Sequence, residues 1–249
     1  MRSLADFEFN KAPLCDGMVL ISELIRDDFP THYVQDELER LLELFYHEWG
    51  FRDSHGVYRL SDALWIDKVL INRQGSAASL GAIVLWIAQR LSLPLVPVIF
   101  PTQLLLRADP ETSEEMWLIN PFNGETLNEH TLEVWLKGNI SPVAELFNED
   151  LDEADNAEVI HKLLDTLKSA LMEERQMELA LRASEALLQF NPEDPYEIRD
   201  RGLIYAQLDC DHVALLDLSY FVEQCPEDPI SEMIRAQINT ISHKQITLH

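Results

Sequence analysis

Apolar residues recur at helical spacing in the first third of the chain and predict that this part is helical. One apolar stripe lies between the turn signals Pro30 and Gly50 and consists of Leu38, Leu41, Leu42, Phe45 and Trp49. Spacings of three and four residues are typical of a helix with one buried face. A second helix is predicted over 61–70. Residues 76–91 are apolar nearly all round, which indicates a helix buried on most sides.

Short apolar runs beyond that helix predict a small antiparallel sheet. The runs are 95–100, 103–108 and 115–120. Turn residues at 109–113 separate the last two runs, so we expect a hairpin there. Pro97 has no amide hydrogen to donate, which places the first strand at a sheet edge or a bulge. A helix over 129–137 follows, with Asn128 as its N-cap and Gly138 at its end.

A five-residue pattern that occurs twice predicts helical repeats in the last third of the chain. Residues 191–195 read Asn-Pro-Glu-Asp-Pro, and residues 225–229, 34 positions later, read Cys-Pro-Glu-Asp-Pro. Two antiparallel helices with their turns use about 34 residues, which is the period of tetratricopeptide repeats. The small or aromatic positions of that repeat are occupied by Ala180, Pro192, Gly202, Tyr205, Ala214 and Pro226. Residues 230–242 are expected to form a terminal helix whose inward face holds Ile230, Met233, Ile234 and Ile238.

An acidic run with few apolar residues separates these two patterns. It covers 147–158 and predicts a solvated linker at 149–157. The chain is therefore predicted to fold as an α+β domain over 1–148, made of helices and antiparallel strands, followed by an all-α domain of helical repeats over 158–249.

The charge balance of the 249 residues narrows the range of partners. There are 44 acidic and 19 basic residues, which give a net charge of −25. A surface this negative repels the phosphates of nucleic acids and of anionic membranes, so neither is expected as a partner. A basic protein is favoured instead, because such a charge steers encounters over long range. The longest apolar stretch, 80–88, is far shorter than a membrane span.

The cysteines, histidines and glycines predict neither a metal nor a cofactor. Cys15, Cys210 and Cys225 are odd in number and widely spaced, which argues against a disulfide framework and fits a reducing cytoplasm. A cytoplasmic location is expected, since no apolar run of secretory length stands at the N-terminus. Cys210 and His212 are too close in sequence for a zinc site of useful spacing, and no glycine-rich phosphate loop occurs.

Four segments carry a resemblance to a known family. They are Asn-Arg-Gln-Gly at 72–75, Leu-Ser-Leu-Pro-Leu at 91–95, Phe-Pro-Thr-Gln-Leu-Leu-Leu-Arg at 100–107 and Ile-Asn-Pro-Phe-Asn-Gly at 119–124. With the repeats downstream, the chain resembles the bacterial SirB-type (YchA-like) proteins, which pair a transglutaminase-like domain with C-terminal tetratricopeptide repeats. The resemblance implies a papain-like fold for the first domain and an association with the regulation of gene expression in bacteria.

Active members of the transglutaminase-like superfamily use a cysteine, a histidine and an aspartate, and the resemblance places these positions at Ala77, Gln103 and Asn120. Alanine carries no nucleophile. The glutamine amide does not titrate, so it cannot act as a general acid or base. Asparagine can orient a catalytic histidine, but no histidine stands at the matching position. The expected function is therefore that of a pseudoenzyme, a noncatalytic protein-interaction or regulatory protein.

Two alternatives remain open from the sequence. Ser76 and Ser79 flank Ala77, and a base within reach would make the chain an enzyme with a substitute nucleophile, such as a peptidase, a transglutaminase or an amide hydrolase. The nearest histidines in the sequence, His55 and His130, are not at motif positions. Without catalysis, the polar surroundings of this site are a candidate cleft for an extended peptide, either open or plugged, formed by Ala77, Gln103, Asn120, Ser76 and Ser79.

Overall fold

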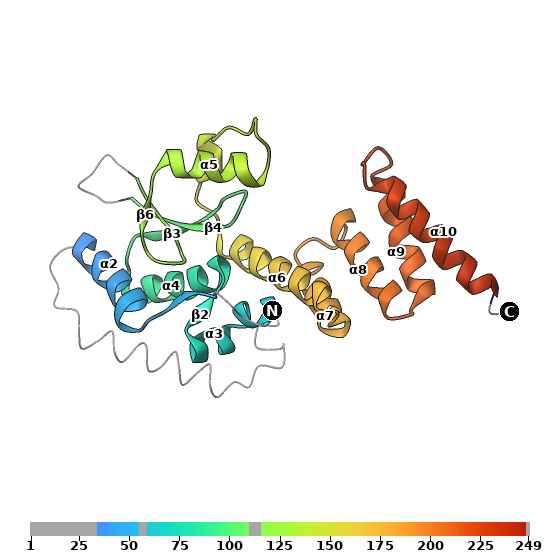
Figure 1. Ribbon diagram of the computed structural model, residues 1–249, viewed down its shortest axis with the longest axis horizontal. Helices are drawn as coiled ribbons and strands as arrows, with labels where there is room; N and C mark the ends of the chain where they lie inside the picture. The colour runs from blue at the N-terminus through green and yellow to red at the C-terminus, as the bar shows by residue number, and fades with distance from the viewer. Residues whose placement is uncertain (1–33, 55–58, 110–115, 248–249) are drawn as a thin grey trace. The chain divides into compact units, whose positions relative to one another are not determined.

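The computed structural model describes residues 34–54, 59–109 and 116–247 (Figure 1). The chain divides between Leu163 and Leu164 into two compact units, and each unit is described by itself. Cys15, Pro30 and His55 lie outside the described residues, as does most of the turn predicted at 109–113.

The apolar stripe predicted near the start of the chain forms one buried helical face. Helix α2 (Val34–Leu42) continues directly into a π-helical turn, η2 (Glu43–Glu48). Leu38, Leu41 and Phe45 are at most 2% exposed, so the predicted stripe is confirmed. The π-helical turn itself was not predicted, because three- and four-residue spacings of apolar positions do not distinguish it from a regular helix.

The helix predicted over 61–70 is interrupted in the structure. Its first residues form a 3-10 turn, η3 (Leu60–Ala63), and helix α3 covers Ile66–Asn72. Directly after α3, strand β2 (Gln74–Gly75) pairs in parallel with strand β1 (Arg52–Asp53). These two-residue strands are too short to produce an alternating pattern in the sequence.

The predicted sheet and hairpin are confirmed. Four antiparallel strands lie side by side in chain order: β3 (Leu95–Ile99), β4 (Leu104–Ala108), β5 (Trp117–Ile119) and β6 (Thr126–Leu127). In the hairpin, Leu106 pairs with Ile119. Pro97 lies in an edge strand, as predicted, and its carbonyl accepts a hydrogen bond from the backbone N–H of Ala154 at 2.9 Å.

Alternating side chains allow this sheet to bury both of its faces. Leu106 and Ile119 pack into one apolar cluster with helix α4 (Ala77–Leu91), whereas Leu105 and Leu118 pack into another with helix α5 (Glu129–Asn139). The two helices lie on opposite sides of the strands (Figure 1). Since successive strand residues point to opposite faces, a continuous apolar run serves both layers. Helix α4 is buried along most of its length, as predicted.

The segment that follows the sheet departs from the prediction in two places. Asn128 is the N-cap of α5, since its side-chain oxygen accepts the N–H of Thr131 at 2.9 Å. However, α5 continues to Asn139, so Gly138 lies inside the helix and does not end it. The expected linker, 149–157, overlaps a 3-10 turn of the first unit, η4 (Asn148–Leu151), and the carbonyl of Leu151 accepts a hydrogen bond from Arg107 at 2.7 Å.

The second unit consists of helical hairpins whose 34-residue period is visible in the contacts. Its helices are α6 (Asn156–Glu173), which begins before the boundary, α7 (Met177–Leu187), α8 (Pro195–Gln207), α9 (Asp211–Gln224) and α10 (Ser231–Thr247). Asp194 accepts the N–H of Tyr196 at 2.9 Å, and Asp228 accepts the N–H of Ile230 at 2.8 Å. The aspartates of the two copies therefore make the same contact with the N–H two residues further on, at the start of α8 in the first copy and just before α10 in the second.

The inward face predicted for the terminal helix is partly wrong. Ile234 is 1% exposed and Ile238 packs beside it, but Ile230 is 38% and Met233 63% exposed. The buried side chain one turn further along is Ile241. Ile230 precedes the helix, which begins at Ser231, so the inward stripe runs through 234, 238 and 241.

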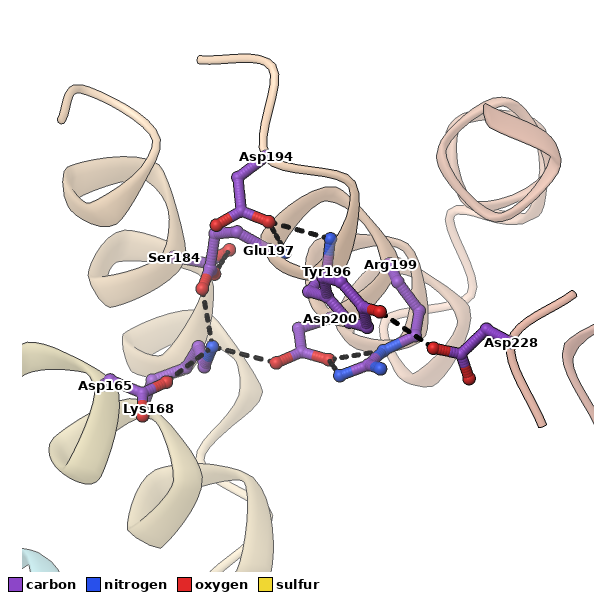
Figure 2. A network of polar contacts seen from close by, with 9 residues as sticks. All are labelled: Asp165, Lys168, Ser184, Asp194, Tyr196, Glu197, Arg199, Asp200 and Asp228. Carbon is purple, nitrogen blue, oxygen red and sulfur yellow. Dashed lines mark hydrogen bonds and ion pairs between the residues drawn. The ribbon is translucent and has the colours of Figure 1, made fainter. Parts of the chain in front are cut away.

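A buried lysine on α6 forms ion pairs with two carboxylates on α8. Lys168 is 1% exposed, and its amine lies 2.6 Å from Glu197, 2.8 Å from Asp200 and 3.1 Å from Asp165 (Figure 2). The hydroxyl of Ser184, on α7, donates to the other carboxylate oxygen of Glu197 at 2.6 Å. Burial by itself lowers the pKa of Lys168, but the carboxylates of Asp200 and Glu197 together raise this pKa by more, so the amine stays charged.

Candidate functional site

The start of α4 is closed by a reciprocal cap between two serines. The Ser76 hydroxyl oxygen accepts the N–H of Ser79 at 3.1 Å, and the Ser79 hydroxyl oxygen accepts the N–H of Ser76 at 2.9 Å. The hydroxyl of Ser79 donates to the carbonyl of Ala63 at 2.6 Å and is fully buried. Both hydroxyls thus satisfy backbone groups at the helix terminus.

The segments that carry the three motif positions converge on α4. Ala77 is its first residue and is 5% exposed. One turn later, a methyl group added at Gly81 would lie 2.6 Å from Leu104 and 3.5 Å from Pro121. Leu104 follows Gln103 in the chain and Pro121 follows Asn120. The arrangement of helix and hairpin expected around the three positions is therefore present, although the three side chains form no hydrogen bond with one another among those described.

Gln103 and Asn120 are used differently in this arrangement. The side-chain nitrogen of Gln103 is buried and has no hydrogen-bond partner among the described residues. The side-chain oxygen of Asn120 accepts the N–H of Phe122 at 3.1 Å, and its backbone carbonyl accepts the N–H of Gly124 at 2.8 Å. Asn120 therefore shapes the turn over 120–124.

Tyr46 fixes this turn from the helical side. Its hydroxyl donates to the carbonyl of Pro121 at 2.7 Å, and a methyl group added at Gly124 would lie 2.5 Å from its ring. Gly124 has a φ of +75°, a conformation that other residues adopt only with strain. Burial raises the pKa of the Tyr46 phenol, so the hydroxyl is a neutral donor at all ordinary pH values.

The raised pKa of Tyr46 predicts a loss of stability at alkaline pH. An unfolded tyrosine ionises at about pH 10 whereas buried Tyr46 stays neutral, so its stabilising contribution is complete below that pH and declines as the pH rises further. Tyr46→Phe should be less stable than the wild type by about 1 kcal/mol at pH 7, because the Pro121 hydrogen bond is lost. The difference should shrink above pH 10 in urea denaturation at several pH values. A stability difference between the two proteins that does not change with pH would contradict the raised pKa of Tyr46.

A cleft of about 570 Å³ opens beside this turn. It is lined by Arg52, Asp53, Gln74, Asn120, Phe122 and Asn123. Asn120 lines this cleft, whereas the other four candidate residues from the sequence, Ser76, Ala77, Ser79 and Gln103, do not. Gln74, Phe122 and Asn123 belong to segments that carry the family resemblance, so the motifs could have indicated these three lining residues. Arg52 and Asp53 could not be predicted, because the pairing of β1 with β2 is not visible in the sequence.

The described part of the chain holds neither a cluster of metal-binding side chains nor a membrane-spanning helix. Among the described residues, no group of three or more histidine, cysteine, aspartate or glutamate side chains is placed to hold a metal ion. No helix within the described ranges is long and apolar enough to cross a membrane.

Comparison with known families agrees with the fold. Residues 18–165 match the transglutaminase-like superfamily, and residues 167–239 match the tetratricopeptide repeat. The predicted class, an α+β transglutaminase-like domain followed by helical repeats, is confirmed. No solved structure matches the chain.

The relatives define the family more closely. The chain is 79% identical to protein SirB1 of Salmonella typhimurium and 72% identical to UPF0162 protein YchA of Escherichia coli K12, over all of each chain. A UPF0162 protein of Vibrio cholerae is 39% identical over the same extent. The chain therefore belongs to the SirB1/YchA family of transglutaminase-like proteins, which confirms the resemblance. Its alignments with SirB1 and YchA have 270 positions, more than the 249 residues of the chain, so some positions are occupied only in the relatives.

Proposed function

We propose that the chain is a noncatalytic protein-interaction protein with a regulatory role, built on a transglutaminase-like scaffold. The observation that carries this proposal lies at the start of α4. Ala77, to which the resemblance assigns the position of the thiol nucleophile, is the first residue of this helix, and the hydroxyls of Ser76 and Ser79 are used in the helix cap.

The surroundings of Ser76 and Ser79 argue against either serine acting as a substitute nucleophile. A serine nucleophile needs a base within hydrogen-bonding reach and access to a substrate. The Ser79 hydroxyl donates to a carbonyl, which cannot accept a proton for catalysis, and it has no exposed surface. Within the described ranges, the hydrogen bonds of both hydroxyls go to each other and to backbone groups, and none goes to a histidine.

The second unit supports the interaction part of the proposal. Tetratricopeptide repeats generally mediate protein–protein contacts, because stacked hairpins present an extended concave surface. The net charge of −25 favours a basic protein as the partner. The free thiols of Cys210 and Cys225 fit action in a reducing compartment such as the cytoplasm.

The test of this proposal has two arms that use the full chain. In the first, incorporation of a dansylated amine into casein and cleavage of the casein are measured, and neither should exceed the protein-free blank. In the second, the immobilised chain should retain a specific protein from lysate at low salt and release it at high salt. Turnover that disappears in Ser76→Ala would refute the noncatalytic assignment. Failure to retain any specific protein at low salt would refute the interaction assignment.

A further inference from the structure

One wall of the cleft carries polar groups that the protein itself does not use. Arg52 pairs with Gln74 in the parallel β1–β2 ladder, so their side chains lie next to each other on the same face. Among the described residues, neither the guanidinium of Arg52 nor the amide of Gln74 has a hydrogen bond or an ion pair. An arginine side chain offers five N–H donors and no acceptor. This wall therefore presents a cation with unused donors.

The other part of the lining comes from the turn over 120–124. The side-chain oxygen of Asn120 is used by the N–H of Phe122, which leaves its NH₂ group as a donor. Asn123 is already engaged, because its NH₂ donates to Glu125 at 2.6 Å and its oxygen accepts the Glu125 N–H at 3.1 Å. The half-buried side chain of Phe122 supplies an apolar surface beside these groups.

The groups that remain unused in the lining favour an anion, although the charges of Arg52 and Asp53 are opposite. Asp53 is the one carboxylate among the lining residues, and it has an interaction of its own within the protein. The unused groups of Arg52 and Asn120 are donors, and they lie in a cleft whose volume suits a small molecule or a few residues. The net charge of −25 opposes a ligand with several negative charges, so among anions one with a single negative charge is favoured.

We propose that this cleft binds a peptide segment through one carboxylate, held by the Arg52 guanidinium with Gln74 and Asn120 as further donors, while an adjacent apolar side chain packs on Phe122. The planar guanidinium matches a carboxylate through two parallel hydrogen bonds. This inference rests on the proposed function, because it treats the cleft as a binding site for a peptide that is not consumed. The carboxylate belongs either to a chain terminus or to an acidic side chain.

Three dansylated tripeptides distinguish these sources in fluorescence anisotropy titrations of the full chain. The probes are dansyl-Ala-Ala-Leu with a free terminal carboxylate, the same peptide with a terminal amide, and dansyl-Ala-Glu-Leu with a terminal amide. At least one carboxylate probe should bind about tenfold more tightly than the uncharged peptide, because hydrogen bonds to a charged group are stronger than those to a neutral one. Preference for the first probe identifies a terminus, and preference for the third identifies a side chain.

Arg52→Gln should abolish this preference, and its position at the surface makes the substitution compatible with folding, which circular dichroism can verify. Arg90→Gln is the matched control, because it removes the same charge near the C-terminal end of α4, outside the lining of the cleft, and should keep the preference. Equal binding of all three probes, no binding of any probe, or an unchanged preference in Arg52→Gln would overturn the proposal. Mass spectrometry of the recovered probes tests the proposed function separately. Cleaved probes would refute the noncatalytic assignment but would not affect the proposed role of Arg52 in binding.

Discussion

Replacing Lys168 with methionine should lower the free energy of unfolding of the repeat unit by about 3–5 kcal/mol. The methionine leaves the carboxylate of Glu197, a 6% exposed residue, without the cation that now lies 2.6 Å away. Ser184 still donates to Glu197, and Arg199 still pairs with Asp200 at 2.6 Å, but neither replaces the lost charge at Glu197. A buried, uncompensated charge is much less favourable than one exposed to water.

The measurement is urea denaturation followed by circular dichroism, read in the transition of residues 164–249 because a chain with two units can unfold in steps. Lys137→Met is the control, since Lys137 is exposed and its pair with Glu133 lies on the surface, where the change should be below about 0.5 kcal/mol. Adding Glu197→Gln to Lys168→Met should restore part of the loss, because the unpaired charge is then removed. A loss below about 1 kcal/mol in the single variant would show that the cluster is not important for stability.

Gly124→Ala should destabilise the first unit by about 2–4 kcal/mol, through two separable effects. The positive φ of Gly124 is strained for alanine, and the added methyl group would lie 2.5 Å from the Tyr46 ring. Relieving that clash must shift either the ring or the turn, and both are joined by the hydrogen bond from Tyr46 to Pro121. The substitution should therefore also disturb the wall of the cleft.

Alanine substitutions at two other glycines distinguish the effect of backbone strain from that of the steric clash in the same denaturation experiment. Gly50 has a φ of +72° with open space around it, so Gly50→Ala should destabilise by strain alone, about 1–2 kcal/mol. Gly138 lies inside α5 with open space and no positive φ, so Gly138→Ala should stabilise by about 0.5–1 kcal/mol. If Gly124→Ala is no worse than Gly50→Ala, the contact with Tyr46 does not matter for stability.

The sequence predicted the elements whose signals are local. Helix α4 is a long, uniformly apolar run, the hairpin has a turn between two short apolar runs, and the repeats recur with a fixed period. The pairing of β1 with β2 joins residues far apart in the chain through two positions on each strand, which no periodicity reveals.

The same physical limit applies to the candidate site. The hairpin brought Gln103 and Asn120 to one end of the sheet, so their neighbourhood could be predicted, but the use of each side chain could not. The oxygen of Asn120 bonds within its own turn and Ser79 bonds to Ala63, a residue sixteen positions earlier. The burial of Lys168 has no signal in the sequence, because a single lysine in an amphipathic helix normally faces water and its main partners lie 29 and 32 positions away.

The course of α6 determines how the two units can be produced separately. The helix begins at Asn156, and its cap is formed by Asp155 and Glu158, which exchange hydrogen bonds at 2.7 and 2.8 Å. A fragment that started at Leu164 would lose this cap and leave the first backbone N–H groups of a shortened helix without partners. Expression of the repeats should therefore start at or before Asp155, although residues up to 165 match the transglutaminase-like family.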